Sequence, residues 1–125
     1  MISRKEALKF VRNCSKHSHL LLASKLMRRL AEKLRVDSLE WELVGLLHDL
    51  DFDEVRGDMS KHGIVTAERL RNKLPDHCLY AIKAHDHRTG FEPKGRLDIA
   101  LIAVDSLAVL IEKARENSGS QRFKI

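Results

Sequence analysis

Residues 97–111 read LDIALIAVDSLAVLI, which is the most apolar stretch of the chain. A helix that is apolar on nearly every side is normally buried, so we expect a buried helix from Leu97 to about Glu116. Asp105 lies in the middle of this helix, where a carboxylate is costly unless it is paired or binds a metal ion. Alternatively, Asp105 pairs with one Arg or Lys, or lies with Ser106 on a narrow solvated stripe.

Outward from this stretch, the spacing of apolar residues and the capping signals predict five more helices. They are a short helix after the Ser3–Glu6 capping box, then His19–Arg35, Leu39–Asp51 (opened by a capping signal at Asp37 and Glu40), Ser60–Leu74 and Asp76–His85. Glycine and acidic residues break the apolar period at 51–58 and 88–95, which we expect to be loops, and 117–125 reads as a frayed tail. We therefore predict an all-α fold, a single compact bundle of about six helices over residues 1–125 with its core at about 10–114.

Composition narrows the class of protein. A chain of 125 residues suits one domain, and 43% hydrophobic with 33% charged residues is typical of a folded globular protein. No apolar run reaches about 18 residues, so no transmembrane helix is expected. The N-terminus lacks the apolar core of a signal peptide, so we expect a cytoplasmic protein with no membrane partner.

Cysteine content and charge add weaker constraints. Cys14 and Cys78 are too few for a disulfide scaffold and too far apart for a CxxC metal motif. The net charge of +5 is scattered over polar faces, without a basic patch interleaved with aromatic residues, which disfavours a nucleic-acid partner. The oligomeric state is left open, and a homo-oligomer is allowed.

His48 and Asp49 are polar residues on a helix that otherwise reads as buried. His48 follows Val44 by four residues, so it points toward the core along the same face. Asp49 is turned from His48 by roughly 100°, and the two side chains can still converge on an ion beside the helix. Gly45 leaves space beside this turn.

Seven histidines occur in the chain, and three of them fall at predicted helix ends. His19 and His62 lie at the starts of two helices, and His85 lies at the end of another. Imidazole together with carboxylate suits Mn, Fe, Co, Ni or Zn. Alternatively, each of these histidines lies on the surface, or lies in the core with its hydrogen bonds satisfied.

The order His19, His48-Asp49, Asp105 resembles the H…HD…D pattern of the HD-domain superfamily of metal-dependent phosphohydrolases. The resemblance extends over roughly residues 10–114. It includes the segments Gly45-Leu46-Leu47-His48-Asp49-Leu50-Asp51, Lys61-His62-Gly63 with Thr66-Ala67-Glu68, and Ala103-Val104-Asp105-Ser106-Leu107.

The resemblance implies a role for each matching residue. The first metal ion would be bound by His19, His48, Asp49 and Asp105. His62 and His85 match the positions that hold a second ion in two-metal members, with Asp49 bridging. The implied cofactor is one or two divalent ions of Mn, Fe, Co, Ni or Zn, with Mg also allowed.

Some positions depart from the family pattern. Asp86 stands where some two-metal relatives have a further histidine, and His87 follows it. Residues 90–93 only faintly echo the Gly-Tyr-Pro signature of relatives that degrade cyclic dinucleotides, so that substrate is not carried over. His17 competes with His19 for the first ligand position, and we prefer His19.

A phosphate substrate also needs cations near the metal. Lys61 lies beside His62, and three more basic residues lie between His85 and the helix of Asp105, namely Arg88, Lys94 and Arg96. We expect these four to contact phosphate, with ordinary solvent-facing charge as the alternative. The acids Asp51, Asp53 and Glu54 either orient water or belong to a solvated loop.

The predicted function is hydrolysis of a phosphate ester of a nucleotide or another small phosphorylated metabolite by a metal-activated water, with His48 and Asp49 as catalytic residues. The sequence does not distinguish a phosphomonoesterase from a phosphodiesterase. One alternative is a non-catalytic HD module that binds a metal or nucleotide as a sensor. A third, less favoured, is a helical protein that binds nucleic acid.

Overall fold

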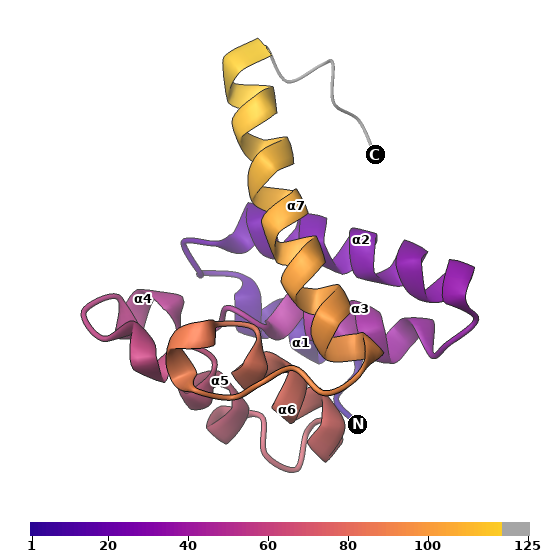
Figure 1. Ribbon diagram of the computed structural model, residues 1–125, viewed down its shortest axis with the longest axis vertical. Helices are drawn as coiled ribbons and strands as arrows, with labels where there is room; N and C mark the ends of the chain where they lie inside the picture. Colours follow the sequence, from indigo (N-terminus) through magenta and orange to yellow (C-terminus); the bar gives the residue numbers. More distant parts are fainter. Residues whose placement is uncertain (119–125) are drawn as a thin grey trace.

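The computed structural model describes residues 1–118, which form seven α-helices and two 3-10 helices and contain no strand (Figure 1). In chain order the elements are α1 (Arg4–Val11), α2 (His17–Leu34), α3 (Ser38–Leu47), α4 (Phe52–Val55), η1 (Met59–Lys61), α5 (Ile64–Arg69), α6 (Asp76–Ala84), η2 (His87–Thr89) and α7 (Arg96–Ser118). Because α4 is a single turn, six α-helices are longer than one turn. The prediction of an all-α fold with about six helices is confirmed.

Two predicted capping signals begin helices in the structure. The Ser3 side chain accepts a hydrogen bond from the Glu6 backbone N–H at 3.1 Å, at the start of α1. The Asp37 side chain accepts one from the Glu40 N–H at 3.0 Å, at the start of α3. Each bond satisfies a backbone donor that the first turn of a helix cannot satisfy itself.

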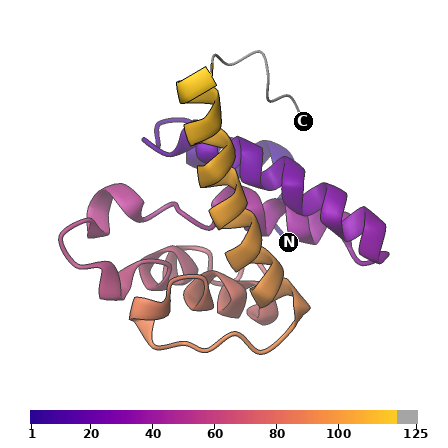
Figure 2. The same ribbon diagram turned by 45° about the horizontal axis from the view of Figure 1, so that its top comes forward.

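The helices pack around one core, with α7 laid across the others. α2 and α3 make the most extensive helix contact, and α7 also contacts α2, α3 and α6. Figure 2 shows α7 crossing α2, with α5 and α6 on the other side of α3. The core is filled by fully buried apolar side chains, among them Leu20, Met27, Leu43, Leu47, Leu70, Ile82 and Leu101.

Gly45 sets the close approach of α2 and α3. A Cβ atom at this position would lie 2.8 Å from the Ala23 carbonyl oxygen and 2.9 Å from Met27 Cγ. The space that Gly45 leaves is therefore filled by α2. This contact brings the first turn of α2, which carries His19, beside the end of α3, which carries His48.

The predicted helix Ser60–Leu74 is wrong as a continuous element. The chain forms η1, breaks at His62 and Gly63, and then forms α5. Gly63 has a φ of 90°, and both its N–H and that of Thr66 donate to the Asp51 carboxylate, at 2.7 and 2.9 Å. A left-handed glycine cannot continue an α-helix, and here it turns the chain so that His62 faces inward.

The segment 51–58 is not wholly a loop, because residues 52–55 form α4. Asp51, which precedes α4, is fully buried. The expectation of a solvated loop is therefore wrong at Asp51, since its carboxylate accepts the backbone bonds that fold the turn after η1.

α7 differs from its prediction in exposure and in length. Only one face of this 23-residue helix meets the core, and Ile99, Leu107 and Leu110 are 60%, 43% and 64% exposed. Its C-terminal part extends past the other helices (Figure 1), so apolar composition alone did not bury it. The helix runs to Ser118, and the rest of the expected frayed tail, residues 119–125, lies outside the described residues. Within residues 1–118, no helix is both long enough and apolar enough to cross a bilayer.

Candidate metal centre

Four of the predicted ligands meet where α2, α3 and α7 converge. His19 lies in the first turn of α2, His48 caps the end of α3 with Asp49 next to it, and Asp105 lies in α7. The Asp105 Oδ1 atom is 2.8 Å from His19 Nε2 and 3.0 Å from His48 Nε2. Asp49 Oδ2 is 3.4 Å from each of the same two nitrogens. These four residues can offer one donor atom each, all within 4.8 Å of one another.

A second group of donors lies on the other side of Asp49. His62 follows η1, and His85 caps the end of α6. Their Nε2 atoms are 2.8 and 3.3 Å from Asp49 Oδ1, and 3.2 Å from each other. Asp49, His62 and His85 therefore form a second set whose donors lie within 4.8 Å.

Asp49 joins the two groups through its two oxygens. Oδ2 faces His19 and His48, whereas Oδ1 faces His62 and His85. A carboxylate with one oxygen toward each group has the geometry required to bridge two ions.

All four imidazoles are held through Nδ1, which leaves Nε2 for the centre. His48 Nδ1 donates to the Gly45 carbonyl at 2.7 Å, and His85 Nδ1 donates to the Ile82 carbonyl at 2.6 Å. The other two donate to carboxylates, at 3.0 Å in the pair His19–Glu112 and 2.7 Å in the pair His62–Asp51. Histidines that bind metals are normally oriented in this way.

The arrangement fits a bound cation. Nδ1 of His48 and His85 must carry the proton, because a carbonyl oxygen only accepts hydrogen bonds. A neutral ring then presents an Nε2 lone pair, and two such lone pairs point at the Asp49 and Asp105 carboxylates. Lone pairs facing anions repel one another unless a proton or a metal ion lies between them. The donor set of imidazole nitrogen and carboxylate oxygen suits a divalent transition metal.

The electrostatics of the first group favour positive charge. Burial lowers the pKa of His48, but the charges of Asp49 and Asp105 oppose this effect and raise that pKa to about 9. Burial raises the pKa of Asp49, yet His48, His62 and His85 together hold it well below its usual range. Asp105 likewise has a lowered pKa, despite its burial, because His19 and His48 donate to it.

The second group has the same character. Burial lowers the pKa of His62, and hydrogen bonds to Asp49 and Asp51 raise it to about 9. Burial raises the pKa of Asp51, but His62 and the N–H groups of Thr66 and Gly63 lower it overall. Without a metal, both groups therefore hold protons at neutral pH in place of a cation.

Exposure identifies the open side of the centre. The side chains of His19, His48, Asp49 and His62 are at most 6% exposed, whereas that of Asp105 is 30% exposed. Asp105 is therefore less buried than its place in an apolar helix suggests, and Ser106 beside it is exposed. Among these five ligands, Asp105 on α7 is therefore the one most accessible to solvent.

Sequence reasoning missed two residues that orient the ligands. Glu112 lies seven residues after Asp105, two turns along the same face of α7, and this spacing was the available signal. Asp51 lies three residues after His48, but its contact with His62 depends on the break at Gly63, which no local pattern indicated.

The predicted phosphate-binding cations lie outside both ligand groups. Arg88 is held by Asp86, with Nε 3.0 Å from Oδ1 and Nη2 2.8 Å from Oδ2. Lys61 lies 3.9 Å from Asp58, and Lys94 Nζ lies 4.6 Å from the centroid of the Tyr80 ring. Arg96, the fourth, is exposed at the start of α7.

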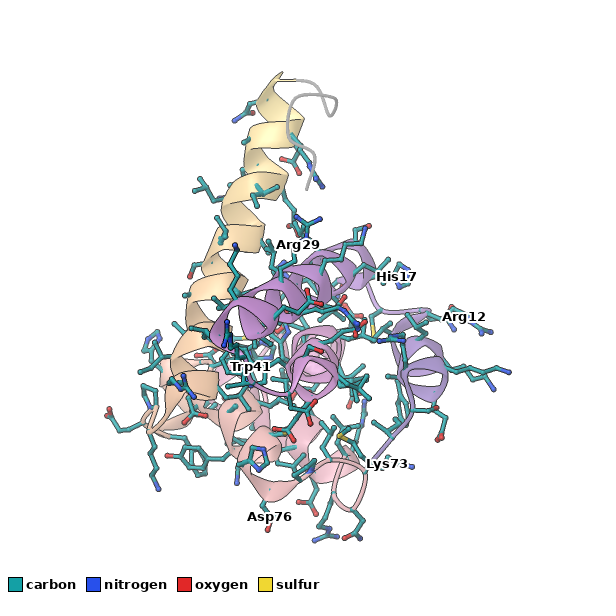
Figure 3. The ribbon with its side chains drawn as sticks, turned by 90° about the vertical axis from the view of Figure 1, so that its right-hand side faces the viewer. Arg12, His17, Arg29, Trp41, Lys73 and Asp76 are labelled. Carbon is teal, nitrogen blue, oxygen red and sulfur yellow. The ribbon has the colours of Figure 1, made fainter. Side chains whose placement is uncertain are left out.

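Other candidates from the sequence do not join the centre. His17 donates from Nδ1 to the Val11 carbonyl at 2.9 Å, and Figure 3 shows it on the side of α2 away from α7. The side chain of His87 is 93% exposed. Asp53 instead accepts the Ser15 N–H at 3.0 Å, and Glu54 forms an ion pair with Arg69.

A comparison with protein-family models gives a match to the HD domain over residues 17–110. Searches of curated proteins and of solved structures found no significant match. The matched range runs from the start of α2 into α7 and contains all six residues of the two donor groups. The chain therefore belongs to the HD-domain family.

Proposed function

We propose that this HD domain is a metal-dependent phosphohydrolase, which cleaves a phosphate ester of a nucleotide or of another small phosphorylated metabolite. The observation that carries the proposal is the set of four inward Nε2 atoms around Asp49 and Asp105. A divalent ion held by these donors would lower the pKa of a water molecule and withdraw charge from a phosphoryl oxygen. The two oxygens of Asp49 contact different pairs of imidazoles, and this supports the binding of a pair of ions.

The chain's own residues have distinct parts in this proposal. His48 and Asp49 hold the reacting groups in place, and their burial keeps the donors from moving. The partly exposed Asp105 lies on the side from which water and substrate enter. Glu112 and Asp51 fix the orientation of His19 and His62, so the donors are positioned before substrate binds.

The phosphate would be held by Lys61, Arg88, Lys94 and Arg96. Arg88 has the strongest structural support, because Asp86 directly follows His85 and fixes the guanidinium. A guanidinium has five N–H donors, and Asp86 engages only part of them. The remaining donors are available for phosphate oxygens.

A small substrate is supported by the space beside the second group. A cavity of about 310 Å³ borders His85 and is lined in part by Phe91, Pro93 and Ile102. This volume lies at the lower end of the range for small-molecule sites. It would hold the leaving group of a compact phosphate ester, although His87 and Glu92 also line it beside the apolar residues.

The experiment that tests the proposal starts from protein purified without chelator or affinity metal. Elemental analysis identifies the ion, and a panel of phosphate monoesters and diesters is then assayed with that ion. We expect Asp105→Asn to lose the ion of the first donor group and, with it, hydrolysis. The matched control is Glu116→Gln, an exposed carboxylate on the same helix, which should retain both.

Two results would contradict the proposal. Folded protein that takes up none of Mn, Fe, Co, Ni or Zn would exclude the metal centre. Protein that binds metal but hydrolyses no ester in the panel would instead support a non-catalytic binding module.

A further inference from the structure

A second cluster of metal-binding side chains lies at the opposite ends of two helices that form the HD centre. Glu40 lies in the first turn of α3, and His77 and Cys78 lie in the first turn of α6. Each offers a donor atom, a carboxylate oxygen, a ring nitrogen and a sulfur, and these atoms lie within 4.8 Å of one another. We propose that this Glu40–His77–Cys78 triad binds one Zn²⁺ ion at a site separate from the HD centre.

The contacts within the triad already bring the three donors together. His77 Nε2 contacts the Glu40 carboxylate, and the Cys78 sulfur lies within 4.8 Å of a donor atom of each of these residues. Zinc in proteins is bound by these three ligand types, and sites with three protein ligands keep a fourth position for water. The side chain of His77 is 63% exposed and that of Glu40 is 16% exposed, whereas Cys78 is buried. An ion would therefore enter beside His77, and the water would lie on that open side.

Sulfur distinguishes this site from the HD centre. Thiolate ligands favour zinc over Mg, Ca and Mn, whereas the HD centre offers only nitrogen and oxygen donors. Burial and the neighbouring Glu40 raise the pKa of the Cys78 thiol, so the thiol is protonated without metal. Zinc binding would displace this proton.

The position of the triad gives it a consequence for the HD centre. Glu40 precedes His48 by eight residues on α3, and His77 precedes His85 by eight residues on α6. At a rise of 1.5 Å per residue, both separations are about 12 Å along the helix axis. Zinc between the beginnings of α3 and α6 would cross-link the helices whose ends carry ligands of the two donor groups. Figure 3 labels the sequence neighbours of the triad, Trp41 on α3 and Asp76 on α6.

The test uses Co²⁺ as a spectroscopic substitute for zinc in the full chain after removal of metals with a chelator. Only a cobalt ion bound to sulfur gives a sulfur-to-cobalt charge-transfer band, so the HD centre is silent in this measurement. We expect the band to appear on titration with Co²⁺ and to disappear when Zn²⁺ is added. Cys78→Ser should abolish the band, and the matched control Cys14→Ser should keep it.

His77→Ala provides a second variant that leaves the core intact, because this side chain is largely exposed. Loss of a ligand should weaken zinc binding by at least about tenfold, the lower end of the effect of removing even a supporting contact. The matched control is His87→Ala, which removes another exposed imidazole. Folded wild-type protein that gives no band, or a band that survives in Cys78→Ser, would overturn the proposal. If Cys78→Ser fails to fold, unchanged zinc affinity in His77→Ala would overturn it.

Discussion

The two halves of the HD centre are built in different ways, although they share Asp49. In the first half, His19, His48 and Asp105 come from three packed helices, and the Asp105 side chain is 30% exposed. In the second half, the His62 and His85 side chains are 6% and 2% exposed, and both lie beyond the ends of helical segments.

This difference indicates that the first half is the more accessible to solvent, whereas the second half is ordered by a buried carboxylate. In the first half the Asp105 side chain is 30% exposed, so its ion would be the one that exchanges with solvent more readily. In the second half neither imidazole is more than 6% exposed, and Asp51 organises it by binding His62, Gly63 and Thr66 at once. The predictions below separate the two halves, beginning with the residue that they share.

Asp49→Asn should have the largest effect, because it removes the charge that both halves use. We expect the protein to lose both ions and hydrolysis to fall by about a thousandfold or more, given the several kcal/mol that metal ions contribute to catalysis. Elemental analysis and steady-state kinetics measure the two effects. Retention of one ion at full occupancy would show that Asp49 does not bridge.

Asp105→Asn and His62→Gln should divide the centre. We expect Asp105→Asn to lose the ion of the first half, and His62→Gln to lose only that of the second, because each variant removes a donor unique to one half. The metal-to-protein ratio of each variant is measured after identical loading, with circular dichroism as the control for folding. Loss of both ions in either variant would show that the halves bind metal as one unit.

Arg88→Ala, Lys94→Ala and Arg96→Ala test the segment that joins His85 to α7. Loss of a charge-assisted bond to phosphate should lower kcat/KM by roughly ten- to a thousandfold. The metal content should be unchanged, because ammonium and guanidinium groups have no lone pair for a metal at neutral pH. If all three variants match the parent protein, the segment is only a connector.

Glu112→Gln and Asp51→Asn compare the residues that support each half. Loss of such a supporting bond should weaken metal affinity by about ten- to a hundredfold, for the first half in Glu112→Gln and for the second in Asp51→Asn. Asp51→Asn should also lower the melting temperature, since this buried carboxylate accepts two backbone N–H bonds, whereas Glu112→Gln should not. Thermal unfolding and metal titration measure the two effects. Identical melting temperatures would contradict the organising role of Asp51.

The smallest expected effect is a release of protons on metal binding. Without metal, the pKa of His48 and that of His62 are both about 9, so each ring is protonated at pH 7 and must lose one proton to bind. The affinity of each half should therefore rise with pH up to about 9 and fall as pH drops, by about tenfold per unit for each proton released. An indicator dye in weak buffer measures the protons. No release at pH 7 would show that these rings are neutral before metal binds.

Several features of the fold and the centre followed from local sequence. Ser3 and Asp37 cap the predicted helices, because a capping bond involves residues only three positions apart. His48 and Asp49 were identified because polar residues interrupt an apolar helix. Asp105 was found for the same reason, although it is less buried than expected.

Other features depended on contacts between distant parts of the chain. Asp51 was read as part of a loop, but it is buried because the turn at Gly63 brings three donors to its carboxylate. At this turn the Ile82 carbonyl oxygen of α6 would lie 2.5 Å from a Cβ at position 63, so only glycine fits against α6. No pattern within residues 51–63 contains that information.

By itself, the sequence determined which residues are able to bind metal and where most of the long helices lie, since donor chemistry and helical periodicity are local properties. Only the tertiary structure decided which donors belong to each half of the HD centre. The two Asp49 oxygens face different pairs of imidazoles, because α2, α3, α6 and α7 converge on Asp49. The Glu40–His77–Cys78 triad likewise exists only because α3 and α6 pack with their first turns together. The physical reason is that packing fixes the distances between side chains on different helices, and those distances are absent from any single segment.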